Sequence, residues 1–199
     1  MNLFILLSTL WVLMACDNAS YTTETPMRIE ADTMVRQVHY DTLNVDPQVA
    51  VKENCFIVIV KQECHLYVCE DCEGDTVCRA HYPVCIGLNK GQKQKEGDMR
   101  TPESSFENPF FITQITSQWM HKSSNYGKIM AYDNGFLRLA TPGFSGIGIH
   151  GSTNTQSPVP GRGTEGCIRL RDHDLGQLKE KYAYVGMKVV ILPDETITN

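Results

Sequence analysis

Short runs of β-branched and alternating residues recur through residues 51–199 and constrain the fold more than any other feature. Segments 55–60 and 188–192 are rich in Val and Ile, and 146–150 and 167–171 alternate apolar with other residues. Further strands are indicated at 65–69, 76–87, 129–132 and 136–139. Asn134-Gly135 between the last two favours a tight hairpin that pairs them. The sequence therefore predicts a domain built mainly of strands.

One convincing helix is predicted near the carboxyl end, with Asp172 or Asp174 as its N-cap. Leu175, Leu178 and Tyr182 share its buried face, and Gly186 marks where it has stopped. A second short helical stretch is predicted at 29–38. We expect a single domain that is mostly β, with one or two helices, arranged as a sandwich or barrel.

The first fifteen residues form an apolar segment that ends at Leu13-Met14-Ala15-Cys16. A helix over 3–15 spans only about 20 Å, too short for a bilayer core of about 30 Å. We expect 1–15 to be a signal peptide and Cys16 to be lipidated, because the segment resembles a bacterial lipobox; plain secretion is the alternative. A polar spacer, 16–50, would separate this anchor from a folded domain at 51–199.

The charge balance and the cysteine content limit where the protein acts. The 199 residues include 18 Lys+Arg and 23 Asp+Glu, a formal charge of −5, which argues against nucleic acid as the main partner. Eight cysteines are many for a reducing cytoplasm. We expect an exported protein of the cell envelope or periplasm, bound to a membrane through its lipid alone; the sequence implies no oligomer.

The residues that carry chemistry lie on two predicted strands joined by a polar loop. If Ile149 and Ile168 face the core, then His150, Cys167 and Arg169 share the opposite face, because side chains alternate along a strand. A neighbouring imidazole can take a proton from a cysteine thiol and later return it to a leaving amine. The pattern predicts Cys167 as a nucleophile and His150 as its general base and acid.

Small and polar residues around this pair are candidates for binding the substrate. Backbone amides at Gly166 or Cys167 could donate to a developing oxyanion, and glycine at positions 151 and 166 permits close approach of a substrate carbonyl. Arg169 could hold a carboxylate. The predicted oxyanion and positioning set comprises Gly151, Ser152, Thr164, Gly166 and Arg169.

The block His150-Gly151, followed by Thr164-Glu165-Gly166-Cys167-Ile168-Arg169-Leu170, resembles the L,D-transpeptidase catalytic domain of the YkuD type. The segments 83–87 and Thr101-Pro102 with Phe106 extend the resemblance over most of the predicted domain. It implies the β-rich fold of that family, with Cys167 as nucleophile, His150 as base, and a backbone carbonyl near Gly151 or Ser152 holding the other imidazole nitrogen.

The resemblance also implies a reaction. Cys167 would attack peptidoglycan tetrapeptide stems, release D-alanine, and pass the acyl group to an amine, forming a cross-link or attaching a protein. No metal or organic cofactor would be needed. One alternative is an L,D-peptidase or amidase that hydrolyses peptidoglycan links on the same scaffold. Another is a non-catalytic peptidoglycan-binding lipoprotein.

Two positions depart from the family pattern. Glu165 stands where the family often has His, and its carboxylate would disfavour the Cys167 thiolate unless Arg162 or Arg169 pairs with it. Ser104 replaces a usual Gly, which suggests a changed turn at the edge of the cleft. Either departure could alter the acceptor.

Six further cysteines lie within 31 residues, and their arrangement is left open by the sequence. Their even number and the exported context allow disulfides, with fifteen possible connectivities. Free buried thiols are an alternative. A metal site is a weaker one, since Cys69-Glu70-Asp71-Cys72 has ligand spacing but no second such pair follows. The six are Cys55, Cys64, Cys69, Cys72, Cys78 and Cys85.

Overall fold

The computed structural model describes residues 52–72, 75–117, 119–123, 127–132, 134–151 and 158–194. The predicted signal peptide, the lipidation site Cys16, the spacer 16–50 and the helical stretch at 29–38 all lie outside these residues. So does Ser152, one of the predicted positioning residues.

Strands are the main regular structure of the described chain, as predicted. A short 3-10 helix, η1 (Lys52–Asn54), leads into the first strand. The strands are β1 (Cys55–Val60), β2 (His65–Cys72), β3 (Asp75–Pro83), β4 (Cys85–Gly87), β5 (Phe110–Thr116), β6 (Trp119–Ser123), β7 (Gly127–Tyr132), β8 (Phe136–Leu139), β9 (Gly148–His150), β10 (Gly161–Thr164), β11 (Ile168–Arg169) and β12 (Lys188–Leu192). The helix α1 (Asp172–Lys181) lies between the last two.

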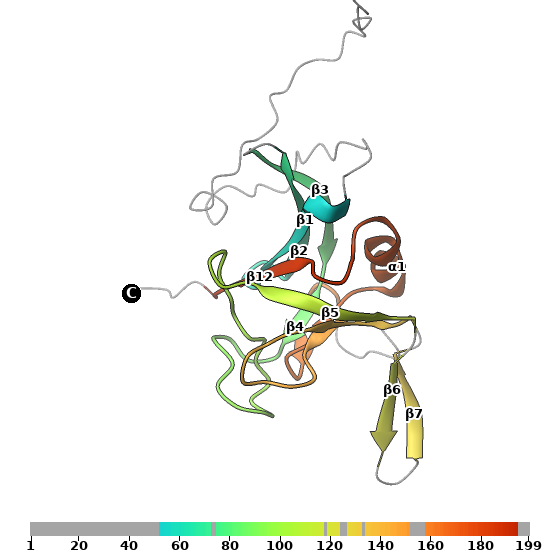
Figure 1. The fold of residues 1–199 in the computed structure, drawn as a ribbon. Helices are drawn as coiled ribbons and strands as arrows, with labels where there is room; N and C mark the ends of the chain where they lie inside the picture. Colours follow the sequence, from blue (N-terminus) through green and yellow to red (C-terminus); the bar gives the residue numbers. More distant parts are fainter. Residues whose placement is uncertain are drawn as a thin grey trace, which may run out of the picture.

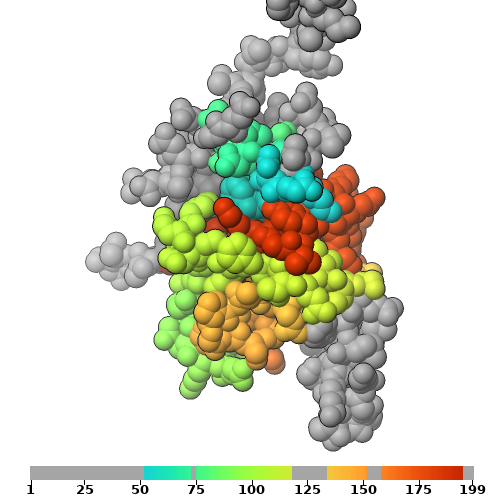
Figure 2. Space-filling view, in the orientation of Figure 1, coloured from blue at the N-terminus to red at the C-terminus, as the bar shows by residue number. Residues whose placement is uncertain are grey.

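Ten of these strands form one curled mixed sheet in the order β10-β4-β11-β9-β8-β5-β12-β1-β2-β3 (Figure 1). The closing strand β12 runs parallel to β1 and antiparallel to β5, which joins the two halves of the sheet. Figure 2 shows β12 in red between the first strands in cyan and the β5 segment in lime. The predicted single, mostly β domain is therefore confirmed, as one curled sheet.

Buried side chains form two clusters that follow the alternation of the strands. The larger cluster contains Ile57, Ile149 and Ile168, and the helix α1 contributes Leu175 and Leu178 to it. These two leucines are fully buried, as the periodicity predicts. Tyr182, the third residue of the predicted buried face, is only partly buried against the same cluster. A smaller cluster, on the other face of β1, β2 and β12, contains Val58, Tyr67, Cys69, Cys78 and Val190.

The predicted hairpin between strands 129–132 and 136–139 is wrong. β7 pairs instead with β6 as a separate two-stranded hairpin that projects from the main sheet, while β8 pairs with β5 and β9 (Figure 1). Gly135 has φ +99°, and a Cβ atom there would lie 2.0 Å from the Thr116 carbonyl oxygen. The glycine thus permits the close approach of two chain segments, not a turn between paired strands.

Two element boundaries also differ from the prediction. The helix begins at Asp172 with Arg171 as its extended N-cap, and no side chain caps it. Asp172 and Asp174 lie inside the first turn, where their negative charges favour the positive end of the helix dipole. The predicted strand 76–87 is divided at Val84 into β3 and β4.

Candidate active site

Three neighbouring strands, β8, β9 and β11, bring the candidate catalytic residues together. His150 is the register partner of Phe136 on β8 and of Arg169 on β11. His150 and Arg169 are both buried, while Ile149 and Ile168 belong to the main core on the opposite face. The predicted common face of His150 and Arg169 is therefore confirmed by the strand register.

The His150 imidazole is fixed on two sides. Its Nδ1 lies 2.6 Å from the Gly151 carbonyl oxygen, which is the backbone contact that the family resemblance implies. The Phe136 ring stacks on it, with centroids 6.1 Å apart and an angle of 10° between the rings. A Cβ atom at Gly151 would lie 2.2 Å from Asp172 Oδ1, so the Asp172 side chain at the start of α1 would have to move to accept a larger residue.

Burial lowers the pKa of His150 to about 4. The hydrogen bond to the Gly151 carbonyl and the Asp172 carboxylate oppose this lowering, whereas the neighbouring Arg169 charge adds to it. An imidazole with this pKa is neutral at pH 7. Because Nδ1 faces a carbonyl and must donate, Nε2 is the nitrogen that can accept a proton.

Cys167 lies immediately before β11 and is half-buried. Its Sγ contacts the Gly146 carbonyl oxygen at 3.3 Å. Burial raises the pKa of this thiol to about 11, and the Glu165 carboxylate raises it further, as predicted from the sequence. A backbone hydrogen bond at Gly148 and the charges of Lys93 and Arg138 act in the opposite direction. The candidate nucleophile is therefore a neutral thiol, and the candidate base on the neighbouring strand is a neutral imidazole.

The predicted positioning residues Thr164 and Gly166 hold the turn that carries Cys167. Thr164 Oγ1 donates to the Cys167 carbonyl oxygen at 2.6 Å and accepts from the Gly166 N–H at 3.2 Å. The expectation that the Gly166 amide is available to an oxyanion is corrected by this contact, which leaves the Cys167 amide as the candidate. Gly166 has φ +131°, and a Cβ atom there would lie 2.6 Å from the Arg100 carbonyl oxygen.

The loop between β4 and β5 packs against this turn through Lys93, which the sequence analysis did not single out. The Lys93 Nζ donates to Asp98 Oδ1 at 2.9 Å and to the Arg100 and Glu165 carbonyl oxygens at 3.4 and 3.5 Å. Its side chain is almost fully buried. Lys93 stands in a polar run with other lysines, so no local pattern distinguishes it.

The two departures from the family pattern have different surroundings. The Glu165 side chain is exposed, and neither arginine named as a possible partner forms an ion pair with it in the described part of the chain; Arg162 instead pairs with Asp194. Ser104 lies against β12, where its Oγ accepts from the Ile191 N–H at 2.9 Å. Ser104 thus takes part in hydrogen bonding with β12. These contacts do not show the changed turn at the cleft edge that the sequence suggested.

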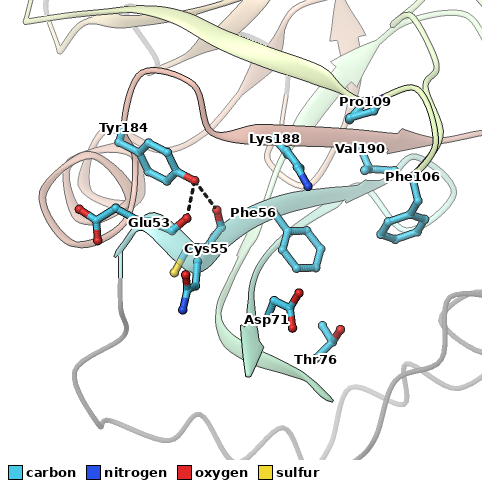
Figure 3. Close-up of a pocket in the computed structure, with 11 residues that line it drawn as sticks. Glu53, Cys55, Phe56, Asp71, Thr76, Phe106, Pro109, Tyr184, Lys188 and Val190 are labelled. Atoms are coloured by element: carbon cyan, nitrogen blue, oxygen red, sulfur yellow. Dashed lines mark hydrogen bonds between the residues drawn. The ribbon is translucent and has the colours of Figure 1, made fainter. Parts of the chain in front are cut away.

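A groove of about 390 Å³ adjoins the thiol, since Gly146 is both a wall of the groove and the contact of Cys167 Sγ. Its other walls include Thr113, Arg138 and Phe144. A second cavity, of about 420 Å³, is lined by β1, β12 and their neighbours, with Tyr184 donating to the Cys55 carbonyl oxygen (Figure 3). Neither His150 nor Cys167 is among the lining residues of either cavity, and the groove reaches the site only through Gly146.

The described residues contain neither a cluster of metal-binding side chains nor a membrane-spanning helix. Within them no group of three or more His, Cys, Asp or Glu side chains is placed to hold a metal ion. The six cysteines outside the site are free thiols, as is Cys167. Over the same residues no helix has the length and apolar character needed to cross a bilayer.

Comparisons with known proteins agree with this geometry. The family model of the L,D-transpeptidase catalytic domain, YkuD, matches residues 55–191. A search of curated proteins finds no match. Solved structures with the same fold include the helical cell shape determining protein Pgp2 from Campylobacter jejuni, at 20% identity and a TM-score of 0.53, covering 72% of this chain and 49% of that chain.

Two further solved structures are similar. Bdellovibrio bacteriovorus Bd1075 has a TM-score of 0.51 and 20% identity, covering 73% of this chain and 51% of that chain. An Enterococcus faecium L,D-transpeptidase mutant has a TM-score of 0.50 and 17% identity, covering 70% and 50%. This chain thus spans about half the length of these solved chains. The family match extends from β1 into β12 and includes the His150 and Cys167 strands, so the chain belongs to the L,D-transpeptidase catalytic domain family.

Proposed function

We propose that this protein is an L,D-transpeptidase that acts on peptidoglycan tetrapeptide stems through a Cys167 thioester. The observation that carries the proposal is the position of His150. Its strand is paired with β11, directly after Cys167, and its Nδ1 is held by the Gly151 carbonyl oxygen. This arrangement leaves Nε2 as the only basic nitrogen of the ring.

The first step starts from the neutral pair. Nε2 of His150 takes the thiol proton as Cys167 Sγ attacks the carbonyl carbon between the L-centre of the diamino acid and the terminal D-residue. The tetrahedral oxyanion accepts the Cys167 N–H, since the Gly166 N–H is bound by Thr164. The C–N bond then breaks, His150 returns the proton to the leaving amine, and D-alanine departs, leaving the thioester.

The second step reverses these roles. An acceptor amine attacks the thioester carbonyl, His150 takes the proton that the amine loses, and the Cys167 sulfur leaves and recovers that proton. The products are a new amide, which is a cross-link or an attached protein, and the free thiol. The residues in this chain account for every proton, so the scheme uses no metal or organic cofactor.

Thr164 and Arg169 have supporting roles in this proposal. Thr164 fixes the Gly166–Cys167 turn through its two hydrogen bonds, and so aims the Cys167 amide and sulfur. The Arg169 charge adds to the effect of burial, which is the main cause of the lowered pKa of His150. Both are positioning residues.

We place this reaction in the cell envelope, with the domain of residues 51–199 tethered through a spacer and a lipid on Cys16. The apolar leader that ends at Cys16 and the need to reach peptidoglycan both support this location. Lipid attachment would hold the protein at a membrane without a spanning helix.

Turnover of a purified disaccharide-tetrapeptide, followed by liquid chromatography and mass spectrometry, tests the function. Transfer predicts a cross-linked dimer together with released D-alanine, and both should be absent with Cys167→Ala. Tripeptide and D-alanine without dimer would assign the chain to the hydrolytic alternative. Binding without turnover, unchanged by Cys167→Ala, would assign it to the non-catalytic alternative.

The intact mass after exposure to a carbapenem locates the nucleophile independently of the acceptor. The wild-type protein should gain the mass of one carbapenem, and Cys167→Ala should gain none. Cys64→Ala is the matched control, because Cys64 is also a partly buried free thiol and is not one of the candidate catalytic residues. An adduct that persists in Cys167→Ala and disappears in Cys64→Ala would overturn the assignment of Cys167.

A further inference from the structure

The β2–β3 hairpin lies at one end of the ten-stranded sheet, and β3 is the edge strand at that end (Figure 1). β2 is paired on both sides, with β1 and with β3, whereas β3 is paired only with β2 in the described sheet. An edge hairpin of this kind opens more readily than central strands. Whatever links its two strands covalently would therefore stabilise the end of the sheet.

Cys69 on β2 and Cys78 on β3 are direct register partners in this hairpin. Both side chains belong to the smaller buried cluster, with Val58, Tyr67 and Val190, so they lie on the same face. Cys69 is fully buried and Cys78 is 9% exposed. The two thiols therefore approach each other inside a packed, apolar environment.

The spacing of directly opposed residues matches the geometry of a disulfide. Opposed residues in antiparallel strands have Cα atoms about 4.5–5.5 Å apart, and disulfides span about 4.4–6.8 Å between Cα atoms. The register shifts by one residue between Val68 and Cys69, and Cys69 and Cys78 are directly opposed on the far side of this shift. A bond between them would close the ten-residue segment from Cys69 to Cys78.

The other cysteines in β-strands have different opposite residues. Cys55 is opposite Glu70 and Cys72 is opposite Asp75. Cys85, which is fully buried, is opposite Gly161 and Arg169. Among the strand registers that the structure describes, Cys69 and Cys78 are thus the one opposed pair of cysteines.

We propose that Cys69 and Cys78 form a structural disulfide that closes the β2–β3 hairpin when the protein folds outside the cytoplasm. The two thiols reduce a disulfide of the glutathione type: the first attacks it and releases one glutathione thiol, and the second attacks the mixed disulfide and releases another. Two electrons and two protons pass to the oxidant, and one protein disulfide forms.

The surroundings of the two sulfurs fit a structural bond and not a reactive one. Burial raises the pKa of Cys69 well above its usual range, with the nearby Cys78 adding to the effect, and burial raises the pKa of Cys78 to about 11. Thiols in this state exchange slowly once covered. The bond would form while the edge hairpin is open and then be protected from reduction.

Peptide mapping after oxidation tests the proposal. The reduced Cys167→Ala protein, in which the half-buried thiol is removed, is held with oxidised glutathione at a temperature a few degrees below its Tm, alkylated, and digested with Glu-C and trypsin. The expected product joins peptide 64–70 to peptide 74–79. Fragmentation of the first peptide then separates Cys69 from Cys64.

The bond should also raise Tm by on the order of 5–10 °C relative to the same protein under reducing conditions, from the loop that it closes. Cys78→Ser should lose both the link and this gain. Cys85→Ser, which removes an equally covered thiol with no cysteine opposite it, should retain both. Recovery of Cys69 and Cys78 as alkylated thiols, or linkage of either to another cysteine, would overturn the proposal. The peptide map of the oxidised Cys167→Ala protein tests the proposed disulfide even if one of the serine variants does not fold.

Discussion

Acidification should destabilise the folded protein through His150. The folded state holds the pKa of this imidazole at about 4, below the ordinary value of 6.5, mainly because the ring is buried. The unfolded chain therefore binds a proton between these two values that the folded state does not bind. The contribution of His150 to stability is complete above pH 6.5 and is lost progressively as the pH falls toward 4.

The size of this effect follows from the difference in proton binding. Each pH unit below 6.5 costs about 1.4 kcal/mol until the folded imidazole also titrates. The loss is thus about 2 kcal/mol at pH 5 and about 3 kcal/mol below pH 4. Arg169 and Asp172 are the charged groups that act on the ring, with opposite signs.

Urea unfolding at pH 7.5 and pH 5 measures the effect. His150→Gln cannot titrate, so its loss of unfolding free energy between the two pH values should be about 2 kcal/mol smaller than that of the wild type. Other acidic groups contribute equally to both proteins and cancel. His173→Gln, at an exposed position, should lose as much as the wild type. Equal losses for wild type and His150→Gln would refute the argument that burial keeps this imidazole neutral.

Three other changes have definite expected outcomes. Lys61→Met should lower the unfolding free energy in urea by about 3 kcal/mol, because it removes a fully buried ammonium from the half-buried carboxylates of Glu103 and Asp194. Gly135→Ala should lower the unfolding free energy by more than about 2 kcal/mol in the same assay, because the residue has a positive φ and the new Cβ atom would meet a carbonyl oxygen. The control, Gly176→Ala, lies in open space on the helix and should raise the unfolding free energy by about 0.5–1 kcal/mol. Glu165→Gln should move the pH dependence of iodoacetamide labelling at Cys167, followed by intact mass, to lower pH, because the carboxylate that raises the thiol pKa is gone; no shift, or a shift upward, would contradict this.

The strands at the centre of the fold could be read from the sequence almost to the residue. β1 and β12 begin and end where the β-branched runs do, because both strands are buried on both faces and depend on apolar packing. The Asn134-Gly135 signal failed for the opposite reason. A hairpin signal is local, but the strand after it finds better partners in β5 and β9, which are distant in sequence.

The candidate site was predictable where its chemistry is encoded in neighbouring residues. The face that His150 shares with Arg169 follows from strand alternation, and the choice of His150 and Cys167 follows from the motif in which they stand. Phe136 and Lys93 could not be predicted in this way, because each reaches the site through contacts between residues that are far apart in the sequence. Phe136 stacks on the imidazole only because β8 pairs with β9, and Lys93 reaches the Cys167 turn only because its loop folds back onto it.

The register of three short strands also explains why the base is neutral. Pairing of β8, β9 and β11 places a phenyl ring on one side of His150 and the Arg169 charge on the other. Both neighbours disfavour an imidazolium, the ring by excluding water and the arginine by repulsion. A thiolate–imidazolium pair would therefore be costly in the free protein, so proton transfer from Cys167 should accompany attack on a bound substrate. In the proposed mechanism, Cys167 is deprotonated only during attack on a bound stem peptide, which would limit its oxidation and unselective acylation.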